Sequence, residues 1–209
     1  NRYVAQMFVL TDEKGNRHYV YCADANVAQL VNSLYQIGNI EDANYMTEEQ
    51  AEQVRVIAMN GYWGMASGIG SMDRVKELIK SAVSNGIVSG DAEALVDNLT
   101  IGGAIAATQL AIWAKANGEN SDIDWENPFE AGKYLTPNGN SNPIYWGLLQ
   151  TNYGTEPAEM NSALALYQAL IATKEVADLN GQKIGQATDI LTDDNFNSAS
   201  VTVMGKESE

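Results

Sequence analysis

Two short apolar stretches near the start of the chain have the residue types of β-strands. The first spans residues 2–10, and the second spans residues 18–22 with alternating side chains. Between them, residues 12–16 combine Asp, Glu, Lys, Gly and Asn, which favour a turn. The pattern predicts an antiparallel hairpin with Cys22 near the end of its second strand. Because side chains alternate along a strand, Cys22 is expected to share a face with His18.

Three segments in the middle of the chain have the patterns of helices. Residues 47–59 open with a Thr-x-x-Gln capping box, in which two side chains satisfy free backbone N–H groups. Residues 71–85 open with a serine cap and carry apolar side chains at the i, i+3, i+4, i+7 spacing of a buried stripe, before an Asn-Gly stop. A shorter helix is expected over residues 91–99.

A further helix, predicted over residues 101–115, is apolar almost all round. A helix of that kind is buried on every side, so we expect it at the centre of the fold. Gln109 lies inside it. A buried glutamine must satisfy its side-chain amide or destabilise the fold by about 1–3 kcal/mol, and the simplest explanation is a hydrogen bond to the backbone.

The remainder of the chain begins with a long irregular stretch. Residues 119–155 are rich in Asn, Gly, Pro and aromatic side chains, a composition typical of an excursion that carries a binding surface. Residues 157–176 return to helical periodicity. Residues 183–191 and 196–204 then have the composition of two strands joined by a polar turn.

Strands at both ends of the chain, with helices between them, predict an α+β fold. We expect a single domain over residues 1–209. Within it, residues 1–30 and 180–209 are predicted to form a β subdomain with a sandwich- or barrel-like sheet. Residues 45–178 are predicted to form a helical subdomain packed against that sheet.

Charge and composition narrow the classes of partner. Acidic residues outnumber basic ones 27 to 12, giving a formal net charge of −15, so nucleic acid is a poor partner. No run reaches the roughly 20 apolar residues of a membrane-spanning helix, so no membrane insertion is expected. The sequence begins at Asn1 and shows neither a signal peptide nor a cell-wall sorting signal, so we expect export and anchoring sequences elsewhere.

The usual catalytic and metal-binding patterns are weak. One Cys and one His cannot supply a structural zinc site, and we expect no metal or other cofactor. The glycines lack a complete phosphate- or dinucleotide-binding fingerprint. His18 and Cys22 are four residues apart on one strand, so about 13 Å separates them, too far for a base and its nucleophile. Taken alone, Cys22 has the simpler explanation of a small buried hydrophobic residue.

Three sequence blocks, taken in their order and spacing, resemble a known family. They are the Tyr-Cys element at residues 21–22, the segment 54–63 that ends in Asn-Gly-Tyr-Trp, and the Thr-Gln-Leu-Ala-Ile-Trp block at residues 108–113. Together they look like the thioester domains of Gram-positive surface adhesins, and the resemblance covers most of the chain. The Tyr-Cys element alone is a weak signal, whereas the block on the buried helix is specific.

The resemblance implies a covalent binding function. Cys22 and Gln109 are expected to join their side chains in a thioester that bridges the two subdomains. The thioester would then react with an amine, such as a lysine on a host or other surface protein. We expect a monomeric, extracellular domain on the bacterial cell surface that acts once and is not an enzyme.

Neighbouring residues are candidates to support this chemistry. Aromatic side chains near the pair in sequence would shield the bond from water, although core packing explains them equally well. The Thr108 hydroxyl or nearby backbone amides would steady the charge on the carbonyl oxygen. The aromatic candidates are Tyr21, Tyr62, Trp63 and Trp113.

Two other functions stay open from the residues alone. One is a protein- or carbohydrate-binding module in which Cys22 and Gln109 are unlinked and binding is reversible. The other is a cysteine hydrolase that uses His18, which needs a bulge in the strand to bring His18 close to Cys22.

Overall fold

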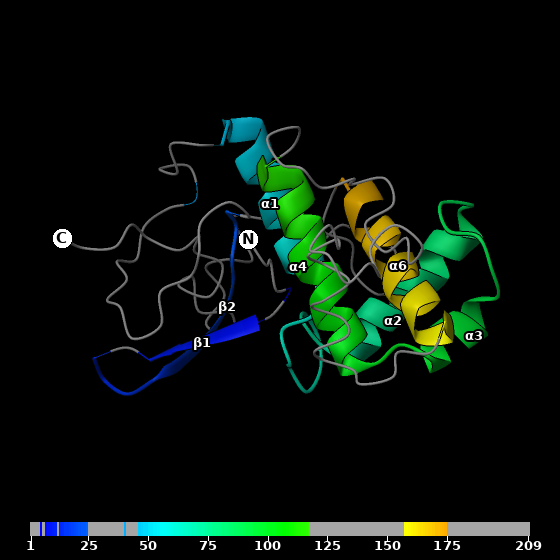
Figure 1. Ribbon diagram of the computed structural model, residues 1–209, viewed down its shortest axis with the longest axis horizontal. Coiled ribbons are helices and arrows are strands. Elements are labelled where there is room, and N and C mark those ends of the chain that lie inside the picture. The colour runs from blue at the N-terminus through cyan, green and yellow to red at the C-terminus, as the bar shows by residue number, and fades with distance from the viewer. Residues whose placement is uncertain are drawn as a thin grey trace, which may run out of the picture.

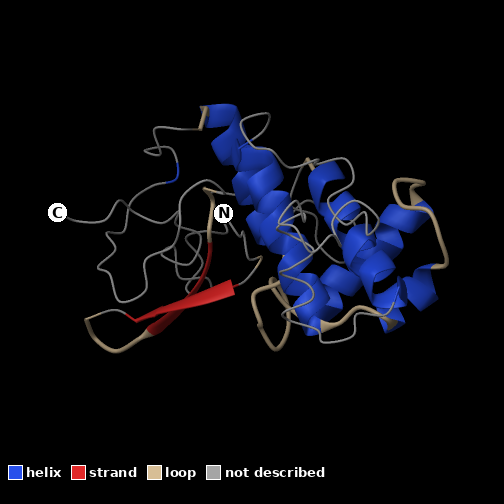
Figure 2. Cartoon of the chain, viewed as in Figure 1, coloured by secondary structure: helices blue, strands red, loops and turns tan. Residues whose placement is uncertain are grey.

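The computed structural model describes residues 5, 7–11, 13–24, 40, 46–117 and 157–174. These residues form a two-stranded hairpin beside a group of helices (Figures 1 and 2). The elements in chain order are β1 (Met7–Thr11), β2 (Arg17–Tyr21), α1 (Glu48–Asn60), α2 (Met72–Ser84), α3 (Ala92–Asp97), α4 (Ile101–Asn117) and α6 (Pro157–Ala172).

The predicted hairpin is confirmed. β1 and β2 pair antiparallel in an unbroken register from Met7 opposite Tyr21 to Thr11 opposite Arg17. Gly15 in the connecting turn has a φ of 84°, a conformation that glycine adopts at little cost. The turn end of the hairpin is exposed to solvent, whereas the last residues of β2 are buried. The buried end of the hairpin therefore lies in the interior, and Cys22 is the first residue after β2.

The helix caps predicted from sequence are also confirmed. Thr47 and Gln50 form the reciprocal capping box of α1, and Ser71 accepts a hydrogen bond from Arg74 N at the start of α2. α3 is shorter than predicted. α4 runs to Asn117, two residues beyond the predicted end, and α6 stops at Ala172. These differences concern only helix ends, where a single turn depends on local contacts.

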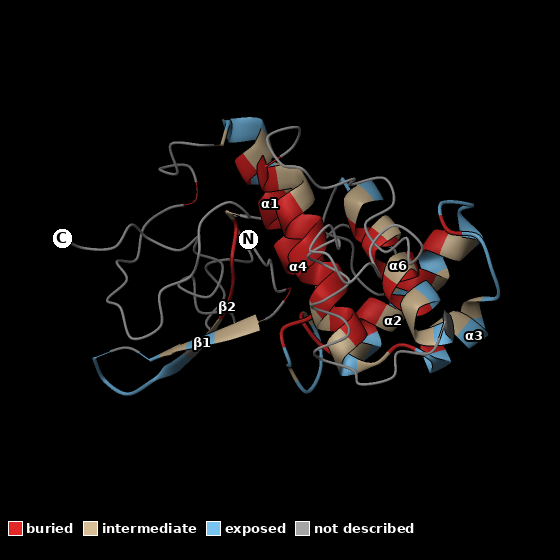
Figure 3. Ribbon diagram, in the orientation of Figure 1, coloured by how far each residue is buried: buried red, intermediate tan, exposed pale blue. Residues whose placement is uncertain are grey.

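α4 is the central helix of the described fold, as its uniform apolarity predicts. It packs against α6 and α1, while α2 packs against α6 and α3. Most of its length is buried (Figure 3), although Ile101 in its first turn is 60% exposed. Gln109 and Thr108 are both fully buried within it. Any polar chemistry at these two positions therefore takes place in the interior.

The described part of the chain is a mixed, helix-rich fold with a small two-stranded sheet. The predicted strands at 183–191 and 196–204 and the excursion at 119–155 lie outside the described residues. A sandwich- or barrel-like sheet and the division into two subdomains therefore stay predictions. None of the described helices is long and apolar enough to cross a membrane.

Candidate functional site

Cys22 and Gln109, which lie 87 residues apart in sequence, meet through a reciprocal pair of hydrogen bonds. The backbone N–H of Cys22 donates to Gln109 Oε1 at 3.0 Å, and Gln109 Nε2 donates to the Cys22 carbonyl oxygen at 2.5 Å. Gln109 is fully buried and Cys22 is 5% exposed. The side-chain carboxamide of the central helix is thus held against the backbone of the one cysteine.

The environment of the Cys22 sulfur keeps it protonated. Burial raises the pKa of the thiol to about 11, and the negative charge of Asp24 acts in the same direction. The Trp113 side chain and the Asp24 backbone act in the opposite direction and lower the pKa of the thiol. The thiol donates to the Asp24 carbonyl oxygen at 3.1 Å. Two neighbours favour the charged form of the sulfur, and of these only Trp113 acts through its side chain.

In any preparation in which Cys22 is a free thiol, we expect slow alkylation that accelerates as pH rises towards 11. A pKa raised from 9.0 to about 11 lowers the thiolate fraction near neutral pH by about 10²-fold. Because folding raises this pKa, its contribution to stability is present below pH 9 and is lost as pH rises towards 11. The check is the rate of iodoacetamide modification against pH for native and urea-unfolded protein. Equal rates near neutral pH would contradict the expectation.

Thr108, next to Gln109 on α4, connects the helix to the turn after α1. Its Oγ1 accepts a hydrogen bond from Tyr62 N at 3.0 Å and donates to the Ala104 carbonyl oxygen at 2.9 Å. A hydroxyl has one proton to donate, and here the Ala104 carbonyl oxygen accepts it. The donor to the Gln109 side-chain oxygen is the Cys22 backbone. Stabilisation of charge on the carbonyl oxygen, by Thr108 or by a backbone amide, stays a prediction.

The turn that carries Tyr62 comes very close to α4 at Gly61. A Cβ on Gly61 would overlap Thr108 Cγ2 and lie 3.0 Å from Thr108 Oγ1 and 3.2 Å from the Ile57 carbonyl oxygen. The φ of Gly61 is −79°, which any residue adopts. Glycine is therefore required here by the close approach of the two segments and not by a left-handed backbone.

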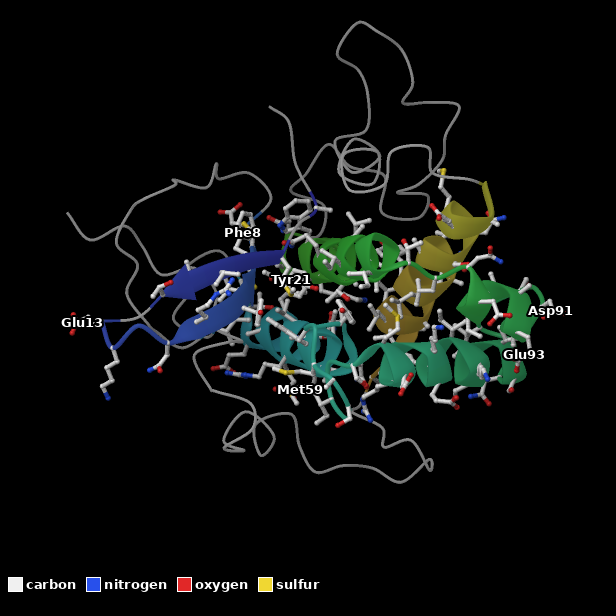
Figure 4. The ribbon with its side chains drawn as sticks, turned by 90° about the horizontal axis from the view of Figure 1, so that it is seen from below. Phe8, Glu13, Tyr21, Met59, Asp91 and Glu93 are labelled. Atoms are coloured by element: carbon white, nitrogen blue, oxygen red, sulfur yellow. The ribbon has the colours of Figure 1, made fainter. Side chains whose placement is uncertain are left out.

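The aromatic residues predicted to surround the pair are buried, and three of them form one connected cluster. Tyr21 donates its hydroxyl proton to the Tyr62 carbonyl oxygen at 2.5 Å. The rings of Tyr21 and Trp63 meet edge to face, with centroids 4.8 Å apart. Figure 4 shows Tyr21 where the hairpin meets α4. Burial also raises the pKa of Tyr21, so its hydroxyl stays neutral.

Asn117, the last residue of α4, is a site residue that the sequence pattern did not reveal. Its Nδ2 donates to the Ala23 carbonyl oxygen at 3.0 Å and to the Trp113 carbonyl oxygen at 2.9 Å. The side chain is buried, at 4% exposure. From sequence, the Asn-Gly pair at 117–118 is only a helix stop. Its contact with Ala23, the residue after Cys22, identifies it as part of the candidate site, and this contact is seen only in the structure.

His18 lies within β2, opposite Leu10. The register of β1 and β2 is unbroken over the whole of β2, so a bulge does not shorten the strand between His18 and its end. At about 3.3 Å per residue, the backbone positions of His18 and Cys22 stay about 13 Å apart. The strand geometry therefore disfavours a Cys–His dyad. Among the described residues, no three His, Cys, Asp or Glu side chains gather into a possible metal site.

Comparison with known proteins identifies the family. The model of the thioester domain family matches residues 19–176, more than half of the chain, and the match includes both Cys22 and Gln109. The chain belongs to the thioester domain family. Neither the curated proteins nor the solved structures gave a match. The family resemblance inferred from the three sequence blocks is thus confirmed.

Proposed function

We propose that this thioester domain is a single-use covalent binder of a surface adhesin. Cys22 and Gln109 form an internal thioester, and an amine on a partner then displaces Cys22 to give a stable amide. The observation that carries the proposal is the reciprocal hydrogen bonding of the Gln109 carboxamide with the Cys22 backbone in the interior. The reacting carbonyl group is thereby held beside the residue that supplies the sulfur.

Thioester formation follows from that contact. The Cys22 sulfur attacks the Gln109 side-chain carbonyl carbon, the carbon–sulfur bond forms, and the carbon–nitrogen bond breaks. The Cys22 N–H points at the oxygen that becomes negatively charged during attack, which is the arrangement that lowers the barrier of acyl transfer. The thiol proton leaves with the nitrogen, so the product lost is ammonia. The Cys22 carbonyl oxygen orients this leaving nitrogen before the bond breaks.

Capture of the partner is a second acyl transfer at the Gln109 carbonyl carbon, in which the Cys22 sulfur is the leaving group. The amine nitrogen bonds to the Gln109 carbonyl carbon, the carbon–sulfur bond breaks, and one amine proton ends on the Cys22 sulfur. A thiolate leaves more readily than an amide nitrogen because its conjugate acid is far stronger. The Trp113 side chain lowers the pKa of the Cys22 thiol and so favours departure of the sulfur as a thiolate. The resulting amide does not revert readily, and the domain acts once.

Burial supports the long lifetime that such a bond needs. A thioester exposed to water hydrolyses before a partner arrives, whereas Gln109 is fully buried and Cys22 nearly so. The cluster of Tyr21, Tyr62 and Trp63 closes the region between β2 and the turn after α1. The contacts that pack this part of the core therefore also keep water away from the pair.

The partner we propose is a protein with an accessible lysine on a host or other surface. The formal charge of −15 favours encounter with basic proteins over acidic ones. A covalent adhesin acts outside the cell, so we propose that the domain is displayed as a monomer on a Gram-positive cell wall and anchored by other sequence.

Intact mass spectrometry tests the proposal directly. Freshly purified protein is expected to be lighter than its sequence mass by one molecule of ammonia, and to gain one methylamine when incubated with that amine. Cys22→Ala is expected to show neither change. Gln50→Ala, which removes a glutamine whose Nε2 contacts the far end of α4 at the Lys115 carbonyl oxygen, is expected to behave as wild type.

The opposite result has an equally clear meaning. A full sequence mass with a titratable thiol in fresh protein would reject the thioester. If Cys22→Ala then still bound a partner, the reversible binding module would be the better explanation.

A further inference from the structure

α4 presents three side chains to the two residues that follow β2. Gln109, Trp113 and Asn117 are spaced i, i+4, i+8 and so fall within an arc of about 80° on the helix. Gln109 binds the backbone of Cys22, Trp113 interacts with its sulfur, and Asn117 binds the Ala23 carbonyl oxygen. The segment after β2 thus lies along one face of α4, which contacts the backbone of Cys22 and then that of Ala23.

We infer that Asn117 is a positioning residue for the reaction between Cys22 and Gln109. By fixing the Ala23 carbonyl, it sets the position of the Cys22 peptide along α4 and therefore where the sulfur meets the carboxamide. The inference rests on the proposed thioester chemistry. It adds a residue that neither touches the reacting atoms nor belongs to the sequence blocks that resemble the family.

The orientation of the Asn117 side chain is itself fixed. Its Nδ2 group donates one hydrogen to the Trp113 carbonyl oxygen, one turn earlier on α4, and the other to the Ala23 carbonyl oxygen. Both acceptors are carbonyl oxygens, so the position requires a donor group. Because the side chain is buried, water does not replace a lost donor without rearrangement.

The reaction would change the hydrogen bonds of Gln109 but not those of Asn117. Thioester formation removes Gln109 Nε2 as ammonia, and with it the hydrogen bond to the Cys22 carbonyl oxygen. The bond from Asn117 to Ala23 involves no reacting atom, so we expect it to persist in the unlinked, thioester and amide states. Asn117 is therefore the contact that holds this segment on α4 while the Gln109 contact changes.

The test is the rate of thioester formation in Asn117→Asp and Asn117→Ala. The protein is made by cell-free translation and sampled over time for loss of ammonia by intact mass. A carboxylate offers no proton to either carbonyl, and a displacement of about 1 Å between reacting groups slows a reaction by about 10²-fold. We expect a loss of that size in Asn117→Asp and a smaller loss in Asn117→Ala, which carries the test if the aspartate variant does not fold.

Two control variants separate positioning from general weakening of the fold. Asn98→Asp removes the same kind of bond, from Asn98 Nδ2 to the Ala94 carbonyl oxygen, at the exposed end of α3. Ser162→Ala removes the hydrogen bond from the buried Ser162 to the Ala158 carbonyl oxygen in α6. Both are expected to form the thioester at the wild-type rate, even where Ser162→Ala melts at a lower temperature.

The outcomes distinguish this inference from the function on which it rests. Wild-type rates in both Asn117 variants, or equal slowing in Ser162→Ala at a matched melting temperature, would overturn the positioning role alone. A wild-type protein that never loses ammonia would overturn the proposed function and the inference together.

Discussion

Replacing Gln109 with leucine is expected to abolish amine capture completely. Leucine fills a similar volume in the centre of α4, but it has no carbonyl carbon for the Cys22 sulfur to attack. Wild type and Gln109→Leu are compared by intact mass after incubation with methylamine. Gln50→Leu is the matched control, because Gln50 also donates a side-chain hydrogen bond but contacts the Lys115 carbonyl oxygen. Methylamine incorporation by Gln109→Leu would place the reactive carbonyl elsewhere.

The same substitution is expected to lower the free energy of unfolding, because it leaves the Cys22 N–H and carbonyl groups without their Gln109 partners. Each unsatisfied buried group destabilises by about 1–3 kcal/mol, so the sum is about 2–6 kcal/mol. The measurement is urea unfolding of Cys22→Ala with and without Gln109→Leu. In that background no thioester forms and the two backbone groups are retained. A difference under about 0.5 kcal/mol, within the scatter of ordinary surface substitutions, would contradict the structural pairing.

Much of the fold was predictable because its determinants are local. The capping box at Thr47 and the serine cap at Ser71 satisfy backbone groups within one turn, and both are present in the structure. The uniform apolarity of α4 predicts its central burial without knowledge of its neighbours. The hairpin likewise follows from two strand-forming segments and a short polar turn.

The contact between Cys22 and Gln109 was predictable only through resemblance, because the two residues are 87 positions apart in sequence. Physical reasoning alone assigned Gln109 a hydrogen bond to backbone, which is correct, but gave no reason to choose Cys22 as the partner. The Asn-Gly pairs beginning at Asn85 and Asn117 are the same local signal. Asn85 is exposed at the end of α2, whereas Asn117 is buried against Ala23. Tertiary contacts decide which of two identical signals serves the site.

The turn after α1 links three parts of the structure that must stay in register for Cys22 to meet Gln109. It receives a hydrogen bond from β2 through Tyr21, and its Tyr62 N–H donates to Thr108 on α4. At the last residue of α1, directly before the turn, buried Arg74 of α2 donates to Asn60 Oδ1 at 3.3 Å. Because the turn contacts the neighbours of both reacting residues, we expect its distance from α4 to affect how the pair meets.

Gly61→Ala is therefore expected to destabilise the fold and to slow thioester formation. The new methyl group would overlap Thr108 Cγ2 and push the turn away from α4. Overpacking of this kind lowers the free energy of unfolding by about 1–3 kcal/mol. It also weakens the hydrogen bond from Tyr62 N to Thr108 Oγ1. The measurements are urea unfolding and the time course of ammonia loss by intact mass.

A second substitution separates this clash from other effects of alanine. Thr108→Ser removes the methyl carbon that obstructs residue 61 but keeps the hydroxyl that binds Tyr62 N and the Ala104 carbonyl oxygen. The double variant Gly61→Ala/Thr108→Ser is therefore expected to recover about 1 kcal/mol or more of the loss, a coupling typical of residues in contact. Additive effects would mean that Gly61 is needed for a reason other than its approach to Thr108. Recovery of both stability and thioester formation would establish that the spacing between the turn and α4 controls the reaction.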